Sequence, residues 1–231
     1  MSGAQWWTAW RDRLDPEAYR VVDSYHRGTR VGGVLVECGV HKGYEFLAHA
    51  PAFDRAIGFE ADAEMADACR AAAKTPNVEV YHLALALQPG PVLLHRYGRR
   101  DTSSLLRLSE AGRAELGAPE LSDVTVPAEP LGLALDRLGV EVVRLLTTDI
   151  QGMDAAIVES ITEHLRARRV LVLITELQPD GTEEWYPGAE NWYSRAERAL
   201  QDTHVCIRSP DTSSAVPPRE FDYVWALRPV G

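Results

Sequence analysis

The stretch VLVECGVHKGYEFL, residues Val34–Leu47, decides how the chain folds. An apolar run ends at Glu37, two glycines follow at Gly39 and Gly43, and a helical pattern begins at Tyr44. A buried strand, a tight turn and a helix in this order are typical of open α/β sheets. Because ligands bind such sheets at the carboxyl ends of the strands, the turn marks a candidate site.

Short apolar runs alternate with helical patterns along the rest of the chain. We expect strands at residues 31–38, 55–62, 77–85, 142–150, 170–177, 203–209 and 220–227, with helices at 44–50, 63–74, 131–138, 153–169 and 192–201. The alternation predicts a mostly parallel seven-stranded sheet that helices cover on both faces. The last two strands lack a helix between them, which predicts an antiparallel edge strand. Residues 91–98 and 124–129 predict an inserted β pair, and the polar stretch 99–123 between them could cover a site.

The length of 231 residues suits one main domain, residues 31–231, after a helical lead-in or lid at residues 1–30 that contains Trp6, Trp7 and Trp10. The net charge of −10 disfavours a nucleic-acid backbone, so no nucleic-acid partner is expected. No apolar run approaches the ~20 residues that span a bilayer, so no membrane partner is expected either. Separated cysteines without metal-ligand spacing, and a start without signal-peptide features, predict a cytoplasmic protein with reduced thiols.

The turn ECGVHKG, residues 37–43, lacks the G-x-G-x-x-G of dinucleotide-binding folds and the Gly-Lys-Ser/Thr of P-loops. A carboxylate before the turn repels a phosphate and suits a positively charged ligand. S-adenosylmethionine is such a ligand, because it has an ammonium group and a sulfonium and no phosphate. A tight turn without any ligand explains the two glycines about equally well.

Two further strand ends extend this nucleoside hypothesis. Glu60, at the end of the second expected strand, can accept hydrogen bonds from both ribose hydroxyls. Leu83 and Ala84, at the end of the third, offer apolar side chains and a backbone edge to an adenine ring. An exposed acid that caps the next helix is the alternative, and it suits Asp62 better than Glu60.

Four stretches together resemble the class I S-adenosylmethionine-dependent methyltransferases, and more narrowly the FkbM family. They are VLVECGVHKG, IGFEAD, DTSSLL (residues 101–106) and LGLALDRLGVEVVRLLTTDIQGMDAAIVES (131–160). The family pattern Lys-x-Asp-x-Glu-Gly-x-Glu is kept at Asp149 and Gly152, and this chain departs from it at Thr147, Gln151 and Asp154. The resemblance, which covers residues 31–177, implies a Rossmann-like class I methyltransferase fold with S-adenosylmethionine as the cofactor.

The residues expected to contact this cofactor come from the first four strand ends and from the DTSSLL stretch. They are Glu37, Gly39, Val40, His41, Gly43, Glu60, Ala61, Leu83, Ala84, Ser103 and Asp149. The residues expected to contact the acceptor are Ser104, Gln151, Trp185 and Tyr186. Oxygen-bearing side chains follow the fourth strand, but we expect no metal.

A hydroxyl acceptor benefits from a general base, and Asp149 is the first candidate because it ends the fourth strand beside the expected pocket. Its structural alternative, at about equal weight, is to cap the helix that begins near Met153. Glu176, at the end of the fifth strand, and His41, inside the glycine turn, are the other catalytic candidates. A histidine in such a place is more often structural than catalytic.

These residues predict O-methylation of a small molecule, either a sugar hydroxyl or a secondary metabolite. Two alternatives stay open: an NAD-dependent oxidoreductase on a related sheet, and a module that binds the cofactor without catalysis. The missing G-x-G-x-x-G and the acid before the turn argue against the first alternative. A small-molecule acceptor is the expected partner, and the tryptophan-rich start permits a homo-oligomer.

Overall fold

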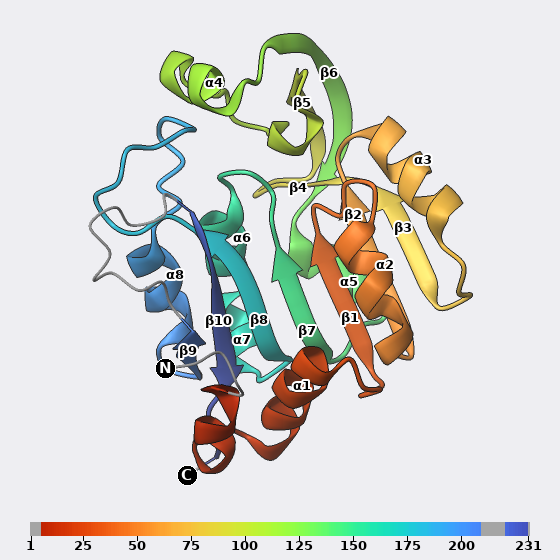
Figure 1. Ribbon diagram of the computed structural model, residues 1–231, viewed down its shortest axis with the longest axis vertical. Helices are drawn as coiled ribbons and strands as arrows, with labels where there is room; N and C mark the ends of the chain where they lie inside the picture. Colours follow the sequence, from red (N-terminus) through yellow and green to blue (C-terminus); the bar gives the residue numbers. More distant parts are fainter. Residues whose placement is uncertain (1–5, 209–219, 231) are drawn as a thin grey trace.

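The computed structural model describes residues 6–208 and 220–230, and within them a seven-stranded sheet forms the centre of the molecule (Figure 1). Its strands are β1 (Val34–Cys38), β2 (Arg55–Glu60), β3 (Val78–His82), β7 (Val143–Thr148), β8 (Val170–Leu177), β9 (His204–Arg208) and β10 (Phe221–Leu227). Their order across the sheet is β3-β2-β1-β7-β8-β10-β9. Neighbours from β3 to β8 pair in parallel, whereas β10 is antiparallel to both β8 and β9. The predicted mostly parallel sheet is confirmed, and its antiparallel strand lies one place inside the edge.

The central strands are apolar on both faces, as strands between two helix layers must be. In β1, Leu35, Val36 and Cys38 are completely buried, although successive side chains point to opposite faces. Leu35 packs in one core cluster, and Val36 and Cys38 pack in the other. Glu37 lies on the Leu35 face, near the carboxyl end of the strand, where the chain leaves the core.

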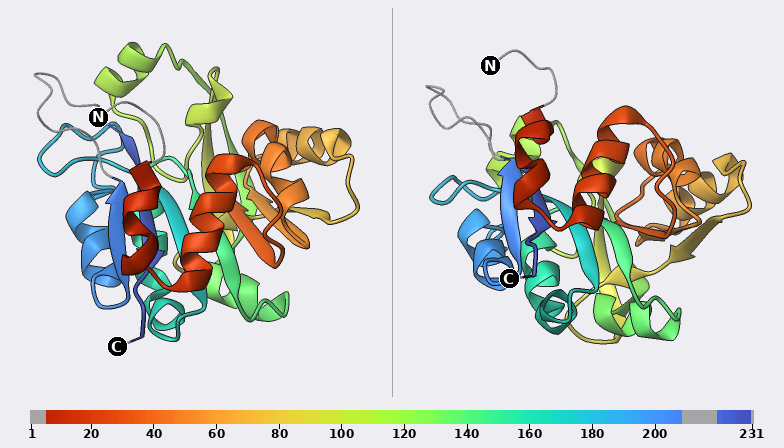
Figure 2. Two further views of the ribbon diagram at one scale, coloured as in Figure 1. Left: turned by 60° about the horizontal axis from the view of Figure 1, so that its bottom comes forward. Right: turned by 90° about the horizontal axis from the view of Figure 1, so that it is seen from below.

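Helices cover both faces of the sheet (Figures 1 and 2). One face carries η1 (Trp6–Arg13), α1 (Pro16–Arg27), α2 (Tyr44–His49), η2 (Ala50–Ala52) and α3 (Ala63–Ala72). The other carries α5 (Leu131–Arg137), α6 (Asp154–Ser160), α7 (Thr162–Arg166) and α8 (Tyr193–Leu200). The single helix expected at residues 153–169 is instead two, separated at Ile161. The hydroxyls of Ser160 and Thr162 donate back to backbone carbonyls at 2.7 and 2.6 Å, and such bonds compete with a continuous helix.

A second sheet lies across the carboxyl ends of the central strands (Figure 1). In the described part of the chain it has three strands, β4 (Ala84–Leu85), β5 (Gly90–Tyr97) and β6 (Glu120–Glu129), in the order β4-β6-β5. Strands β5 and β6 are the predicted inserted pair, which is confirmed. The third expected strand divides at Leu83, because β3 stays in the main sheet while β4 pairs in parallel with β6. The stretch 99–123 is not irregular throughout, since it contains η3 (Arg100–Thr102) and α4 (Glu110–Leu116).

Helix α1 rests on the sheet beside β7, β8 and β10, and η1 packs against α1. Trp7 donates its Nε1 to Asp23 at 2.9 Å and stacks on His26, with 4.3 Å between the ring centroids. The division into a lead-in and a main domain stays a prediction. Of the helices in the described ranges, none is both long enough and apolar enough to cross a bilayer.

Candidate active site

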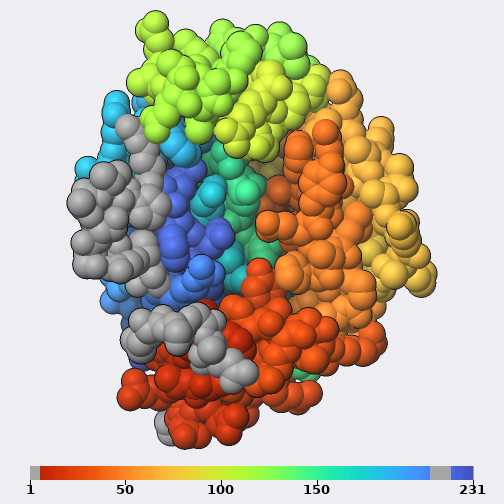
Figure 3. Space-filling view, viewed as in Figure 1, coloured from red at the N-terminus to blue at the C-terminus, as the bar shows by residue number. Residues whose placement is uncertain are grey.

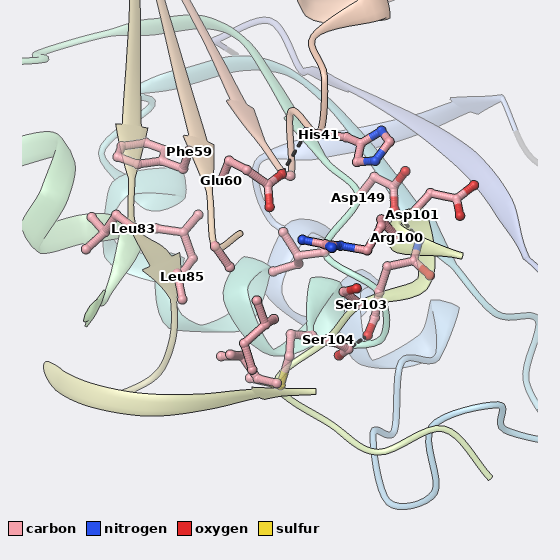
Figure 4. Close-up of a pocket in the computed structure, with 18 residues that line it drawn as sticks. His41, Phe59, Glu60, Leu83, Leu85, Arg100, Asp101, Ser103, Ser104 and Asp149 are labelled. Atoms are coloured by element: carbon pink, nitrogen blue, oxygen red, sulfur yellow. Dashed lines mark hydrogen bonds between the residues drawn. The ribbon is translucent and has the colours of Figure 1, made fainter. Parts of the chain in front are cut away.

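Two adjoining pockets lie at the carboxyl ends of the central strands (Figure 3). The first of them, next to the small sheet, is drawn in Figure 4. The β2 pocket is bounded by the ends of β1, β2 and β4, and about 660 Å³ of space between its atoms includes its opening to solvent. The β8 pocket extends toward α2, β8 and β10, and the corresponding space of about 1090 Å³ also includes its opening. Gly39, His41, Asp101 and Asp149 line both pockets, so the two share one wall.

The glycine turn forms part of that wall, and packing explains both of its glycines. Gly39 has φ +89°, and a Cβ at this position would collide with the carbonyl oxygen of Asp149. The Asp149 N–H donates to the carbonyl oxygen of Cys38 at 3.0 Å, which ties the end of β7 to the turn. Gly43 has φ +81°, and a Cβ there would collide with Sγ of Cys69. Gly39 therefore lets the turn and Asp149 meet at the junction of the pockets, and Gly43 lets the turn pack against Cys69.

Glu60 faces the β2 pocket, and two backbone donors hold its carboxylate (Figure 4). The His41 N–H donates to Oε2 at 2.7 Å, and the Asp62 N–H donates to Oε1 at 2.8 Å. Burial raises the pKa of Glu60, and these hydrogen bonds oppose the rise. Each carboxylate oxygen keeps a lone pair for a ligand hydroxyl. Helix α3 is capped by Asp62 instead, which accepts from the Glu64 N–H at 3.0 Å.

The rest of the β2 pocket is largely apolar and contains one arginine. Its apolar lining consists of Phe59, Leu83, Leu85, Leu94, Leu105, Ile150 and Met153, with two alanines. Arg100 reaches into the pocket and pairs with the buried Asp62 carboxylate, with Nε at 3.0 Å (Figure 4). Arg96 Nε lies 3.4 Å from the same carboxylate. The acid next to this pocket is therefore neutralised by the protein itself.

Acidic side chains dominate the β8 pocket. Its six carboxyl groups are those of Glu37, Glu45, Asp101, Asp149, Glu176 and Asp222. Rings come from Tyr25, Tyr44, His41 and His49, and no lysine or arginine from residues 6–208 or 220–230 lines the pocket. Burial raises the pKa of Glu37 to about 8, and burial with the nearby Glu45 charge raises that of Asp222. Such a lining favours protonated carboxyls or a positively charged ligand.

Asp149 directly follows β7, and Glu176 lies near the end of β8. One side-chain amide bridges the two carboxyl groups. Gln151 Nε2 lies 2.6 Å from Asp149 Oδ1 and 3.4 Å from Glu176 Oε2. Burial raises the pKa of Asp149, which the Gln151 hydrogen bond opposes, and burial with the Asp149 charge raises the pKa of Glu176. The pair therefore retains one proton readily, with Glu176 as the protonated member. An ionised Asp149 beside a protonated Glu176 can accept a proton from a ligand.

The two histidines at this end of the sheet differ in their environment. His41 lines both pockets, its Nε2 is buried without a hydrogen-bond partner, and burial lowers its pKa, so the ring is neutral. His82 Nε2 lies 3.1 Å from the carbonyl oxygen of Ala61, which is a structural contact. Across the described ranges, no group of three or more His, Cys, Asp or Glu side chains is arranged to hold a metal ion.

The structure places most of the predicted site residues at the two pockets. The β2 pocket contains Gly39, His41, Glu60, Ala61, Leu83, Ala84, Ser103, Ser104, Asp149 and Gln151. The β8 pocket adds Glu37, Val40 and Glu176. Gly43, Trp185 and Tyr186 line neither pocket. Trp185 Nε1 donates to Glu115 Oε2 at 3.3 Å on α4, and Tyr186 is buried behind Gln151. The roles assigned to all these residues stay predictions.

Sequence reasoning misses several lining residues. They are Phe59, Leu85, Leu94, Arg100, Asp101, Leu105, Ile150 and Met153 in the β2 pocket, and Tyr25, Tyr44, Glu45, His49, Thr147, Thr148, Ile174 and Asp222 in the β8 pocket. Adjacency is a usable signal for Phe59 and Ile150, because each neighbours a predicted residue in the chain. Tyr25 and Asp222 come from α1 and β10, and no sequence pattern places these elements beside the glycine turn.

No protein-family model matches the sequence, and no curated relative matches it. Solved structures match in fold. The N-methyltransferase NodS from Bradyrhizobium japonicum WM9 is 8% identical over 100% of both chains, with a TM-score of 0.49. An rRNA methylase from Streptococcus thermophilus is 9% identical over 93% of this chain and 98% of its own, with a TM-score of 0.46. A putative tRNA methyltransferase from Streptococcus pneumoniae is 13% identical over 92% of this chain and 71% of its own, with a TM-score of 0.45.

At these identities the likeness concerns the fold alone, which is a Rossmann-like mixed α/β sheet with a separate small sheet. The expectation that nucleic acid is excluded as a partner is wrong. Two of the matched structures are described as an rRNA methylase and a tRNA methyltransferase.

Proposed function

We propose that the protein is a methyltransferase that uses S-adenosylmethionine and methylates a hydroxyl group of a small molecule. A sugar or a secondary metabolite is the proposed acceptor class, and FkbM is the proposed family. One observation carries the proposal. Glu60, held by the glycine turn, faces a pocket that shares a wall with a second pocket containing Asp149 and Glu176. This arrangement joins a place for a nucleoside to a place for proton transfer.

The chemistry of the β2 pocket supports a nucleoside ligand. Glu60 has lone pairs for both ribose hydroxyls, and its position is fixed before any ligand binds. Leu83 and Leu85 provide apolar surface for an adenine ring.

The shared wall supports a phosphate-free, positively charged tail. Glu37 and Gly39 line the β8 pocket there, and an ammonium group beside Glu37 favours the ionised form of this buried acid. A pyrophosphate would meet the acids of the β8 pocket at the same place, which favours S-adenosylmethionine over NAD. When bound, S-adenosylmethionine supplies an activated methyl group.

The task left to the protein is to orient the acceptor and take its proton. A hydroxyl in the β8 pocket, next to the shared wall, can donate to Asp149. Before the transfer, the protonated Glu176 donates a hydrogen bond to the ionised Asp149. The hydroxyl proton then moves to Asp149, and Glu176 keeps its own proton. The acidic lining favours an acceptor that is neutral or positively charged around the reacting hydroxyl.

Methyl-labelled S-adenosylmethionine and a panel of sugars and hydroxylated metabolites test the proposal. We expect the label on at least one hydroxyl compound, and a thermal shift with S-adenosylhomocysteine but not with NAD. A shift with NAD alone would indicate the oxidoreductase instead. A shift with S-adenosylhomocysteine and no transfer across the panel would indicate a module that binds the cofactor without catalysis.

A further inference from the structure

Gln151 lies between the carboxyl pair and a buried phenol. Its Nε2 is 2.6 Å from Asp149 Oδ1 and 3.4 Å from Glu176 Oε2, and its Oε1 is 3.0 Å from the Tyr186 hydroxyl. The same hydroxyl lies 2.8 Å from the carbonyl oxygen of Thr102. A single amide thus connects the candidate base to a tyrosine that lines neither pocket.

The backbone of Gln151 is fixed independently of its side chain. Ser104 Oγ donates to the Gln151 carbonyl oxygen at 2.6 Å. The φ of Gln151 is +58°, a conformation that residues with a Cβ rarely adopt. Gly152 packs against the Tyr186 ring, where a Cβ would come within 3.0 Å of Cδ2. The freedom that remains is the orientation of the amide, that is, whether its nitrogen or its oxygen faces the carboxyls.

The Tyr186 hydroxyl bears on that orientation because it carries one proton. This side chain is 2% exposed and burial raises its pKa, so the hydroxyl stays protonated. When the amide nitrogen faces the carboxyls, Gln151 donates to Asp149, and its Oε1 shares the Tyr186 hydroxyl proton with the Thr102 carbonyl oxygen. In the reversed orientation, the amide oxygen would face the Asp149 carboxylate. Two acceptors would then oppose each other unless the carboxyl pair took up another proton.

The charged groups around Asp149 and Glu176 are mostly acidic on the elements that face them. The acids are Glu37 on β1, Glu45 on α2, Asp101 on η3, Asp154 on α6, Glu220 before β10 and Asp222 on β10. His41 in the turn is neutral, and the positive charge of Arg208 on β9 acts on Asp222. Negative neighbours push both carboxyls toward their protonated forms. An amide donor at 2.6 Å opposes this push at Asp149.

We propose that Tyr186 is a positioning residue for the candidate base: its hydroxyl orients the Gln151 amide so that the amide nitrogen keeps Asp149 ionised. The inference rests on the proposed function for the reaction in which Asp149 acts. In that reaction one proton moves from the acceptor oxygen to Asp149, and Tyr186 and Gln151 keep their own protons. The coupling between tyrosine, amide and carboxylate is a property of the free protein and needs no acceptor.

The test is a carboxyl titration of the full chain by ¹³C NMR, with Asp149 and Glu176 assigned from Asp149→Asn and Glu176→Gln. Gln151→Met keeps the length of the side chain and removes the donor, so we expect it to raise the protonation midpoint of Asp149 by about one pH unit. Tyr186→Phe should raise it by a smaller amount, because the amide remains but is no longer oriented.

Tyr193→Phe is the matched control. It removes a tyrosine hydroxyl that also donates to a carboxylate, Glu197 Oε1 at 2.8 Å, outside both pockets. Its Asp149 midpoint should equal that of the wild type. An unchanged midpoint in Tyr186→Phe overturns the inference, even if Gln151→Met shifts it. A purely structural tyrosine would lower the thermal transition without moving this midpoint.

Should Tyr186→Phe fail to fold, fluorotyrosine at position 186 alone replaces it, because Tyr25 and Tyr44 also line the β8 pocket. A fluorinated phenol is a stronger donor, so we expect a lower Asp149 midpoint, and an unchanged midpoint overturns the inference. Calorimetry with S-adenosylhomocysteine on the same wild-type sample keeps the two proposals apart. Absence of binding contradicts the proposed function, whereas the titration decides the role of Tyr186 alone.

Discussion

The carboxylates of the β2 pocket and of the β8 pocket differ in the partners that surround them. Beside the β2 pocket, Glu60 accepts from two backbone N–H groups and Asp62 pairs with Arg100. In the β8 pocket the acids face one another, and Asp149 accepts from the neutral amide of Gln151. Because the pockets share a wall, this contrast arises within one continuous site.

The difference separates recognition from reaction. A carboxylate with fixed donors is preorganised, so it can receive ligand hydroxyls without rearrangement. Carboxyls crowded by burial and like charges have raised pKa values, so their ionised forms are stronger proton acceptors, as a general base needs. The β2 pocket is therefore suited to hold a ligand, and the β8 pocket is suited to move a proton.

The largest effect is expected when the candidate base of the β8 pocket, Asp149, is replaced. Asp149→Asn keeps the shape of the side chain but cannot take a proton, so methyl transfer to a hydroxyl should fall by roughly 10²- to 10⁴-fold. Affinity for S-adenosylhomocysteine should change far less. Initial rates and calorimetry measure the two effects. Asp67→Asn, an exposed acid of α3 that pairs with Arg70, is the control. Unimpaired turnover in Asp149→Asn would remove this residue as the base.

The next largest effect is expected on the free energy of unfolding, when Gly39 in the shared wall is replaced. Gly39→Ala puts a Cβ against the Asp149 carbonyl oxygen and strains a backbone with φ +89°, so the free energy of unfolding should fall by about 3 kcal/mol or more. Gly28 also has positive φ, at +63°, but a Cβ there meets nothing within 4 Å. Gly28→Ala should therefore cost only about 1 kcal/mol. Urea unfolding compares the two, and equal losses would contradict the packing explanation.

The recognition side is broken by Glu60→Gln. One end of the amide becomes a donor and faces either the His41 or the Asp62 N–H, so the preorganised acceptor is lost. Affinity for S-adenosylhomocysteine should fall by roughly 10- to 100-fold. Calorimetry measures it, with Glu163→Gln on the exposed surface of α7 as the control. Wild-type affinity in Glu60→Gln would show that Glu60 does not contact the ligand.

The last predicted effect is a change of slope with pH, and it concerns a buried acid near Asp149. Asp154 is completely buried, and burial with the Asp149 charge raises its pKa to about 7 from an ordinary value of 3.8. The folded protein therefore binds this proton more tightly than the unfolded chain. Its stabilising contribution is complete below about pH 4, and it is lost as the pH rises through 7.

Urea unfolding at pH 5, 6 and 7 checks this dependence. Asp154→Asn should flatten the decline in unfolding free energy by up to about 1.4 kcal/mol per pH unit. Glu141→Gln, which changes an exposed acid, should keep the wild-type slope. If Asp154→Asn and the wild type decline equally, then Asp154 does not take up a proton on folding.

Local patterns made the fold predictable, whereas long-range placement did not follow from them. The apolar run before Glu37 and the turn after it determine a strand, a bend and a helix within fourteen residues, Val34–Leu47. The position of β10 between β8 and β9 depends on pairing between distant segments, and periodicity does not encode such pairing. Asp222 and Tyr25 therefore reached the β8 pocket without a sequence signal.

The glycine turn illustrates the same limit. Its sequence fitted close approach of a ligand and a tight connection about equally well. The structure shows that a Cβ at Gly39 would meet the carbonyl oxygen of Asp149, from another strand end, and no sequence pattern indicated that contact. Gln151 was expected to contact the acceptor, and its contacts with Asp149 and Tyr186 depend on a loop that sequence pattern cannot fold.

A crystal structure with S-adenosylhomocysteine tests most directly whether the two pockets form one methyl-transfer site. We expect adenosine in the β2 pocket, both ribose hydroxyls on Glu60, and the sulfur at the shared wall, facing the β8 pocket beside Asp149. A β2 pocket that stays empty at saturating ligand, or a ribose bound away from Glu60, would contradict it.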